Sequence, residues 1–323
     1  MPVSSAITKF VALLRDSLKE LLKNDPLRMA GATAFFTTFA LPPILVILIQ
    51  ALKLFLNPET VRAELFSNLS GLFGPEAVKQ IVDILSALRK LAQNWWITIG
   101  GFIFLLFVAT TLFRVIRNSL NQIWKIRRVE HKTMAVNLAS RIKAIAVILV
   151  AGVLFVVGIV AEGMQAFIGR YIFEFSPLLS SYFNTTLNNV ISIIIVTVWF
   201  AIVFRYLTDG KPQWSVSFVG ALVTALLFTI GKIILHWLLT YSNINTLYGA
   251  SASIVLVLLF VFYSSLILYY GAAFTKLWGL YRRQPIRPRP HSIHYKVIEA
   301  EVEEGMDNRA PPMIKNDTPP SRK

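Results

Sequence analysis

Six long apolar stretches constrain the fold of this chain more than any other feature of its sequence. They cover residues 30–52, 95–115, 144–166, 188–206, 217–239 and 252–274. A helix needs about 20 mostly apolar residues to cross the hydrocarbon core of a bilayer. Because each stretch is about that long, the sequence predicts an all-α, multi-pass membrane bundle with six transmembrane helices.

The composition agrees with a membrane protein. Hydrophobic residues make up 55% of the 323 positions and charged residues only 15%, whereas soluble domains carry about 25% charged residues. The mean hydropathy is +0.60. The chain has no cysteine, which excludes disulfides, thiolate metal sites and a cysteine nucleophile.

The basic residues predict the orientation of the bundle. The segments before the first stretch, between the second and third, between the fourth and fifth, and after the sixth carry 25 of the 32 Lys and Arg, counting Arg114 and Arg205 at the inner ends of the second and fourth stretches. The opposite segments carry 6, and Lys232 lies inside the fifth stretch. Lys and Arg concentrate in cytoplasmic loops, so we expect both termini in the cytoplasm. The net charge of +15 is then a signal of orientation, and no nucleic-acid partner is expected.

Two segments outside the stretches show amphipathic helical patterns within the predicted membrane domain, residues 1–282. In residues 5–23 apolar side chains recur every three to four positions, with basic residues between them. This pattern predicts a helix lying at the membrane interface; a coiled-coil arm is the alternative. Residues 57–93 contain two helix starts at prolines, each followed by an apolar face. They predict a helical cap outside the bilayer.

The end of the chain differs in character from the rest. From residue 283 onward, prolines are mixed with charged residues, a composition typical of disordered segments. We therefore predict a disordered cytoplasmic tail over 283–323. A short strand near residues 294–302 is the alternative.

Two charged residues lie inside the predicted spans. Glu162 lies roughly 27 Å along the third span and Lys232 roughly 22 Å along the fifth. Each shares a helix face with small residues, which let helices pack closely. Because buried charge is costly in a bilayer, we predict a polar site formed by Glu162, Lys232 and His236 that binds an anionic group or relays a proton. A structural ion pair, or side chains that reach separately to the outer surface, are the alternatives.

A second polar group lies at the inner end of the second span. Arg114, Asn118 and Asn121 follow one another at i, i+4 and i+7, with Arg117 beside them. Basic residues at the cytoplasmic interface bind lipid phosphates, and amides at membrane depth bond across helices. These four residues predict a lipid-phosphate or interhelical polar site; an ordinary basic flank of a span is the alternative.

The sequence contains no pattern that indicates catalysis. It has no glycine-rich phosphate loop ending in Lys-Ser or Lys-Thr, and its four histidines show no metal-binding spacing. Nucleases need clustered carboxylates for their metal ions, and the predicted cytoplasmic side has none outside the tail. We expect no catalytic residues, no metal and no cofactor.

Several short motifs occur in a fixed order between about residues 10 and 282. They are Arg28-x-Ala30-Gly31-Ala32-x-Ala34-Phe35-Phe36 with Leu41-x-Pro43, Arg117-Asn118-x-x-Asn121-x-Ile123-Trp124, Gly220-Ala221 with Gly231-Lys232, Tyr248-Gly249, Tyr263-Ser264-Ser265, and Leu268-x-x-Gly271-Ala272. Together they resemble the YihY/virulence factor BrkB family of bacterial inner-membrane proteins.

The resemblance implies a plasma-membrane protein with six spans, and it adds weight to Lys232, Asn118 and Asn121, which lie within its motifs. Some members carry a ribonuclease label, which the absence of clustered carboxylates argues against here. This chain also has Ala273 at a position where the family often has an acid.

The leading hypothesis is a transporter, or a protein that handles lipid or another envelope component, in the bacterial inner membrane. The alternative is a non-transporting scaffold that recruits envelope partners. The expected partners are membrane lipids and a small anionic or lipid substrate. The substrate, the direction and energy source of transport, and the oligomeric state stay open.

Overall fold

The computed structural model describes residues 3–52, 75–91, 95–129, 177–241 and 252–296, with isolated positions between 59 and 70 and between 146 and 158. This part of the chain is mostly helical, as predicted. Its helices are α1 (Val3–Leu22), α2 (Pro26–Leu52), α4 (Pro75–Leu91), α5 (Trp95–Ile123), α7 (Pro177–Ile202), α8 (Trp214–Tyr241) and α10 (Ala252–Tyr281), with a π-helical turn η1 (Val203–Leu207) that continues α7.

Five of the six predicted apolar stretches lie within α2, α5, α7 with η1, α8 and α10. The predicted third span, 144–166, lies for the most part outside the described residues. Among the residues described, three segments are long and apolar enough to cross a membrane, namely Asn189–Leu207, Trp214–Leu235 and Ile254–Tyr281. The count of six spans therefore stays a prediction.

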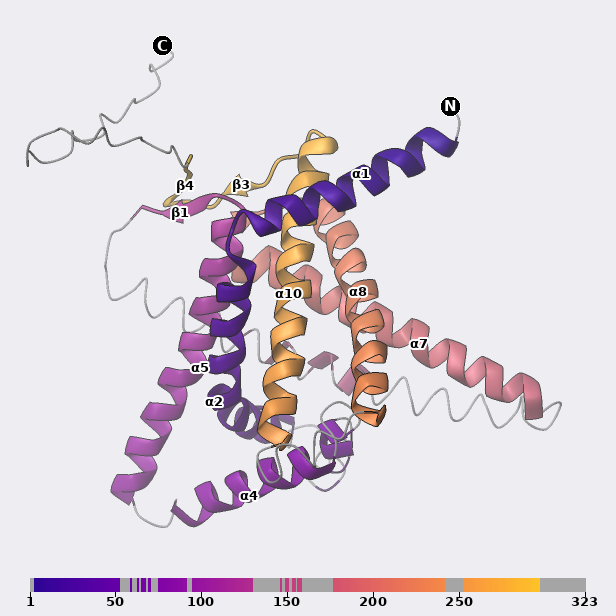
Figure 1. Cartoon of the computed structure of the whole chain (residues 1–323). Coiled ribbons are helices and arrows are strands. Elements are labelled where there is room, and N and C mark those ends of the chain that lie inside the picture. Colours follow the sequence, from indigo (N-terminus) through magenta and orange to yellow (C-terminus); the bar gives the residue numbers. More distant parts are fainter. Residues whose placement is uncertain are drawn as a thin grey trace, which may run out of the picture.

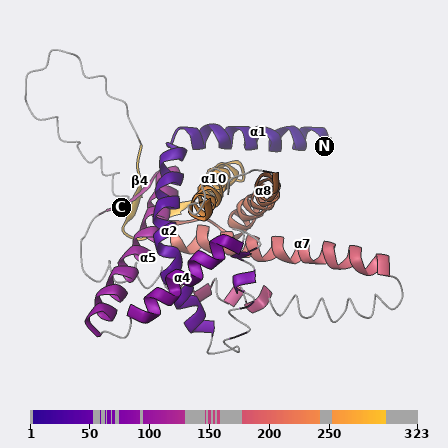
Figure 2. The ribbon, with the colours of Figure 1, turned by 60° about the horizontal axis from the view of Figure 1, so that its bottom comes forward.

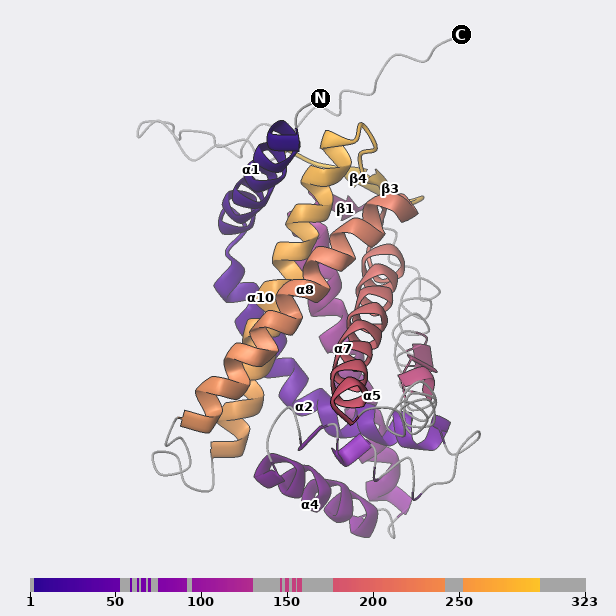
Figure 3. The same cartoon turned by 90° about the vertical axis from the view of Figure 1, so that its right-hand side faces the viewer.

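The helix α10 lies at the centre of the described bundle (Figure 1). It packs against α2 and α8, while α5 packs against α2 and α7 against α8. The helix α1 crosses one end of the bundle against α10, and α4 lies at the opposite end, as Figures 1 and 3 both show. In Figure 2 the helices α8 and α10 are seen side by side and nearly end-on, with α1 running past them.

The amphipathic pattern of residues 5–23 does form a helix, α1. One face of α1 packs on the bundle, where Ser17 and Leu21 are buried and the ring of Phe10 meets Phe274 edge-on at 5.8 Å. Leu18 on the adjoining face is exposed. The helix therefore has one apolar stripe against α10 and a second that faces away from the protein. Of the predicted cap, 57–93, the structure describes α4 and a few isolated positions before it.

The helices α8 and α10 are antiparallel and make a close, reciprocal contact. A Cβ on Gly220 would collide with the hydroxyl of Thr275, and a Cβ on Gly271 would collide with the hydroxyl of Thr224. Each threonine hydroxyl donates instead to the glycine carbonyl one turn earlier on its own helix, at 2.7 Å. Further along, a Cβ on Gly231 would lie 2.8 Å from the ring of Tyr263. Small residues thus allow the two backbones to approach.

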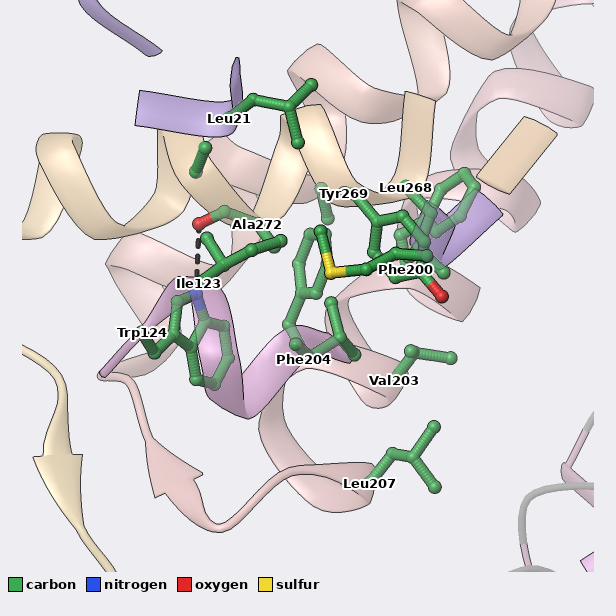
Figure 4. Close-up of a cluster of buried hydrophobic side chains, with 14 of the residues drawn as sticks. Leu21, Ile123, Trp124, Phe200, Val203, Phe204, Leu207, Leu268, Tyr269 and Ala272 are labelled. Carbon is green, nitrogen blue, oxygen red and sulfur yellow. Dashed lines mark hydrogen bonds between the residues drawn. The ribbon is translucent and has the colours of Figure 1, made fainter. Parts of the chain in front are cut away.

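A group of fully buried aromatic side chains joins the helices near the end that carries α1. Trp124, just beyond α5, donates from Nε1 to the carbonyl oxygen of Ala272 in α10 at 2.9 Å (Figure 4). Tyr269 shares a 2.5 Å hydrogen bond with the hydroxyl of Thr33 in α2. The ring of Phe204 in η1 lies 6.3 Å from that of Trp124. This cluster connects α2, α5, α10 and η1, and it fixes the ends of these elements relative to one another.

Two small antiparallel sheets cover the same end. The strand β1 (Ile126–Arg128) pairs with β4 (Ser292–His294), and β2 (Gly210–Lys211) pairs with β3 (Arg287–Pro288). The prediction of disorder was wrong for residues 286–295, because this segment folds back onto the loops after α5 and η1.

The reason for this difference is local. Ile286 is buried in the core cluster, and backbone amides of Arg289 and Tyr295 donate to Asp209 and Lys125 at 2.8 and 3.0 Å. The prolines that suggested disorder are compatible with such short edge strands. Residues 297–323 lie outside the described part of the chain.

Candidate functional site

The described residues contain a buried carboxylate at the end of the bundle where α1 lies. Asp209, between η1 and β2, has a side chain only 4% exposed. Its oxygens accept hydrogen bonds from Arg117 in α5, with Nε at 3.0 Å from Oδ2 and Nη2 at 2.6 Å from Oδ1. Arg128 in β1 adds a contact from Nη2 to Oδ1 at 3.2 Å. One carboxylate therefore joins three elements.

Asn121 holds the same aspartate in two ways. Its Nδ2 donates to Oδ2 of Asp209 at 2.8 Å, and its Oδ1 accepts the backbone amide of Asp209 at 3.0 Å. Arg117 and Asn121 are one helical turn apart and so lie on one face of α5. Because of this spacing, both side chains bind the same aspartate.

The neighbours of Asp209 in the chain, Thr208 and Gly210, fix the backbone on either side of it. The hydroxyl of Thr208 donates to the carbonyl oxygens of Phe204 and Gly210, at 2.9 and 3.1 Å. A Cβ on Gly210 would lie 2.7 Å from the ring of Trp124, so only glycine fits beneath that ring. The preceding turn η1 is π-helical, a geometry that often marks functional positions.

The charged state of Asp209 follows from its neighbours. Burial alone would raise the pKa of this carboxyl, but the hydrogen bond and positive charge of Arg117, with Arg128 and Asn121, outweigh it. The pKa of Asp209 is accordingly lower than its ordinary value, and the group is ionised at neutral pH.

Two further arginines surround this contact. Arg289 donates from Nη2 to the carbonyl oxygen of Arg205 at 2.5 Å, and the guanidinium of Arg205 lies 4.7 Å from the centre of the Trp214 ring. Burial and the positive charges of Arg205 and Arg117 lower the pKa of Arg289, against the opposing effect of Asp209. We call Arg117, Arg128, Arg205, Arg289 and Asp209 the arginine cluster. Its four arginines and one aspartate leave a surplus of three positive charges.

A second group of polar contacts fixes the corner between α1 and α2. Lys276 in α10 donates to Glu20 of α1 at 2.6 Å and to the carbonyl oxygen of Ile123 at 3.0 Å. Lys125 donates to the side chain of Asn24 at 2.8 Å. Burial and the positive charge of Lys276 lower the pKa of Lys125, while Glu20 opposes this. This corner holds α1 across the end of the bundle.

The structure separates the residues predicted at the inner end of the second span. Arg117 and Asn121 meet at Asp209, whereas the side chains of Arg114 and Asn118 are exposed. Lys232 is half-buried on α8. Glu162 and the side chain of His236 lie outside the described residues, so the predicted intramembrane site stays a prediction.

The residues that the sequence did not single out are Asp209, Arg128, Arg205 and Arg289. One signal was present, because Asp209 is the only acid in the short segment 207–216 between two apolar stretches. It lies 88 positions from Asn121, and that separation hides the pairing. Within the described ranges, no group of three or more His, Asp or Glu side chains is arranged to hold a metal ion.

Comparison with known proteins identifies the family. A family model described as "Virulence factor BrkB" matches residues 17–292, most of the chain. The chain belongs to the BrkB family. This match confirms the predicted resemblance. It includes α2 to α10, β1 to β3 and the first residue of β4, so the arginine cluster lies wholly inside the BrkB region.

Curated relatives of this BrkB-family chain are membrane proteins by name. A UPF0761 membrane protein of Mannheimia succiniciproducens is 25% identical, covering 80% of this chain and 86% of its own length. One from Actinobacillus pleuropneumoniae is 26% identical, covering 84% and 94%, and one from Haemophilus influenzae is 25% identical, covering 79% and 90%. No solved structure matches the chain. The chain is thus an integral membrane protein of the BrkB family with apolar helices.

Proposed function

We propose that this BrkB-family chain is a six-span inner-membrane protein that transports or otherwise handles an anionic lipid or envelope component. The observation that carries the proposal is the arginine cluster, which leaves a surplus of three positive charges at the ends of apolar helices. Basic side chains just beyond the ends of transmembrane helices are positioned to meet the phosphates of lipid headgroups. Arginine is well suited to such groups because its planar fork matches phosphate geometry.

The arrangement of the bundle supports an orientation with the cluster in the cytoplasm. The helix α1, the four strands and the arginine cluster all lie at one end, with α4 at the other (Figure 1). The basic residues of the chain concentrate in the segments that meet at this end, in keeping with the positive-inside rule. We therefore propose that both termini are cytoplasmic and that residues 57–93 form a cap outside.

The exposed apolar surface supports direct contact with lipid. The three apolar segments bury only 28%, 28% and 39% of their most apolar windows inside the protein. Lys232 lies on one of them, and we propose that it forms the polar site within the bilayer together with Glu162 and His236.

Movement of a labelled lipid between the leaflets of proteoliposomes tests this function. We expect the wild type to speed the movement of phosphatidylglycerol, which is anionic, more than that of phosphatidylcholine, which is zwitterionic. Lys232→Met should abolish that difference, and Lys211→Met, which removes an exposed cation, should not. Bound phosphatidylglycerol without movement would favour the scaffold instead. No binding and no movement would contradict the proposed function.

A further inference from the structure

Three buried hydrogen-bond donors lack acceptors, two of them in the arginine cluster and one beside it. They are Nε of Arg128, Nε of Arg289 and Oγ of Ser292, each without a partner among the described residues. Ser292 as a whole is only 8% exposed. Buried donors are almost always paired in folded proteins, and unpaired ones frequently mark the place of a bound molecule or ion. Here, three such donors occur within two neighbouring segments.

The three donors belong to one small region. Arg128 and Ser292 are opposite each other in the pairing of β1 with β4, so their side chains project from the same face of that sheet. The turn before β4 is closed by a hydrogen bond from the amide of Ser292 to the carbonyl oxygen of Arg289 at 3.0 Å. The guanidinium of Arg128 contacts the carboxylate of Asp209 at 3.2 Å, and the backbone amide of Arg289 donates to the carbonyl oxygen of Asp209 at 2.8 Å.

The aspartate does not satisfy this group of donors. Its two oxygens already accept from Arg117, Asn121 and Arg128. The four arginines of the cluster outnumber its one aspartate, and burial, with the charges of Arg205 and Arg117, lowers the pKa of Arg289. A second anion near these donors would remove that surplus and supply the missing acceptors.

We propose that Arg128, Arg289 and Ser292 form a binding site for a phosphate group. The inference deepens the proposed function, on which it rests, by naming phosphate as the anionic part of the substrate. Two guanidinium groups and a hydroxyl offer the donors that phosphate oxygens accept. The phosphate belongs either to a lipid headgroup or to a small soluble molecule, and the site chemistry is the same for both.

Binding measurements on the purified full-length protein test the site. In a phosphate-free maltoside detergent, inorganic phosphate is titrated against chloride at constant ionic strength. In a second arm, nanodiscs of an uncharged galactolipid are compared with nanodiscs containing phosphatidylglycerol. Binding is followed by the midpoint of thermal unfolding and by calorimetry. Saturable stabilisation by inorganic phosphate indicates a soluble ligand, and stabilisation by phosphatidylglycerol alone indicates a lipid headgroup.

The variants remove the proposed donors and keep the charge. Arg128→Lys and Arg289→Lys each delete an Nε–H, and we expect each to weaken phosphate or phosphatidylglycerol binding by about tenfold or more, the range for a hydrogen bond to a charged group. Arg127→Lys and Arg287→Lys are matched controls, because these neighbours are exposed; binding should not change. Ser292→Ala is a smaller change that tests the site if a lysine variant fails to fold.

The outcomes separate the site from the function. Wild-type binding no stronger than for chloride or the galactolipid, or equal loss in the control variants, would overturn the phosphate site. A site that binds phosphate in a protein that neither retains nor moves lipid would leave the site standing and refute the proposed function. Lipid movement that survives in all three site variants would support the proposed function and refute a role of this phosphate site in it.

Discussion

Arg117 of α5 and Asp209 lie 92 positions apart in the chain, and three hydrogen bonds join the guanidinium to the two oxygens of the carboxylate. This bidentate geometry fixes direction as well as distance. The contact joins the end of α5 to the turn that follows η1. Asp209 also binds Arg128 of β1, and β1 pairs with β4, which follows α10. The contact therefore organises the end of the bundle where we propose that phosphate binds.

Replacement of Asp209 by asparagine should destabilise the protein strongly. The change keeps the shape of the side chain but leaves Arg117 and Arg128 buried or partly buried without a counter-charge. Loss of one partner from such a pair costs about 3–5 kcal/mol. The midpoint of thermal unfolding in detergent, followed by tryptophan fluorescence, measures this effect.

The matched control is Asp16→Asn. Asp16 lies 3.9 Å from Lys19 in a pair that is more than half exposed, and such surface pairs contribute at most about 1 kcal/mol. Equal midpoints for the Asp209 and Asp16 variants would show that the arginine cluster does not depend on its aspartate.

The pH dependence of stability should report the same group. The pKa of Asp209 is lower in the folded protein than its ordinary value of about 3.9. Its ionised form therefore stabilises the fold fully above that value, and the contribution is lost as the pH falls through the folded pKa. The difference in unfolding midpoint between wild type and Asp209→Asn should stay constant from about pH 5 to 7 and shrink below about pH 4. A difference that does not change at low pH would assign the stabilisation to something other than this charge.

The sequence allows much of the helical framework to be predicted, because span length and apolar periodicity are local properties. The helix over residues 5–23 and the apolar stretches in α8 and α10 follow from them directly. The strands after α10 do not, since their stability comes from contacts with segments far away in the chain. Asp209 escaped notice for the same reason: its partners are set by the packing of α5 against the turn after η1, which no local pattern encodes.

The contact between α8 and α10 leads to a prediction about two glycines. Gly271→Ala would place a Cβ against the hydroxyl of Thr224, on a rigid β-branched side chain, and overpacking of this kind costs about 1–3 kcal/mol. Gly31→Ala in α2 is the control, because its Cβ would meet no atom within 4 Å and alanine favours a helix.

Unfolding midpoints of the two variants measure the contrast. The Gly271 variant should lie below wild type, and the Gly31 variant at or above it. If Gly271→Ala is tolerated as well as Gly31→Ala, then α8 and α10 are not in close contact at this position.

The salt bridge between Glu20 and Lys276 should keep α1 on the end of the bundle. Its two side chains are about four-fifths buried and lie 2.6 Å apart. We expect Glu20→Gln to loosen α1, so that trypsin cleaves at Arg15 and Lys19 several times faster while the remaining helices stay folded. The Asp16→Asn protein, measured under the same conditions, should be cleaved at the wild-type rate. Unchanged cleavage in Glu20→Gln would mean that the apolar contacts of α1 hold it without this pair.

Native mass spectrometry of the protein released from inner membranes tests the central claim most directly, because it identifies the lipids that remain bound. The account predicts that phosphatidylglycerol or another anionic phospholipid is retained above its share of the membrane. It also predicts that this enrichment falls to the membrane average in Arg289→Lys but persists in Arg287→Lys. Bound lipid that matches the membrane composition in the wild type, or enrichment that is the same in both variants, would contradict it.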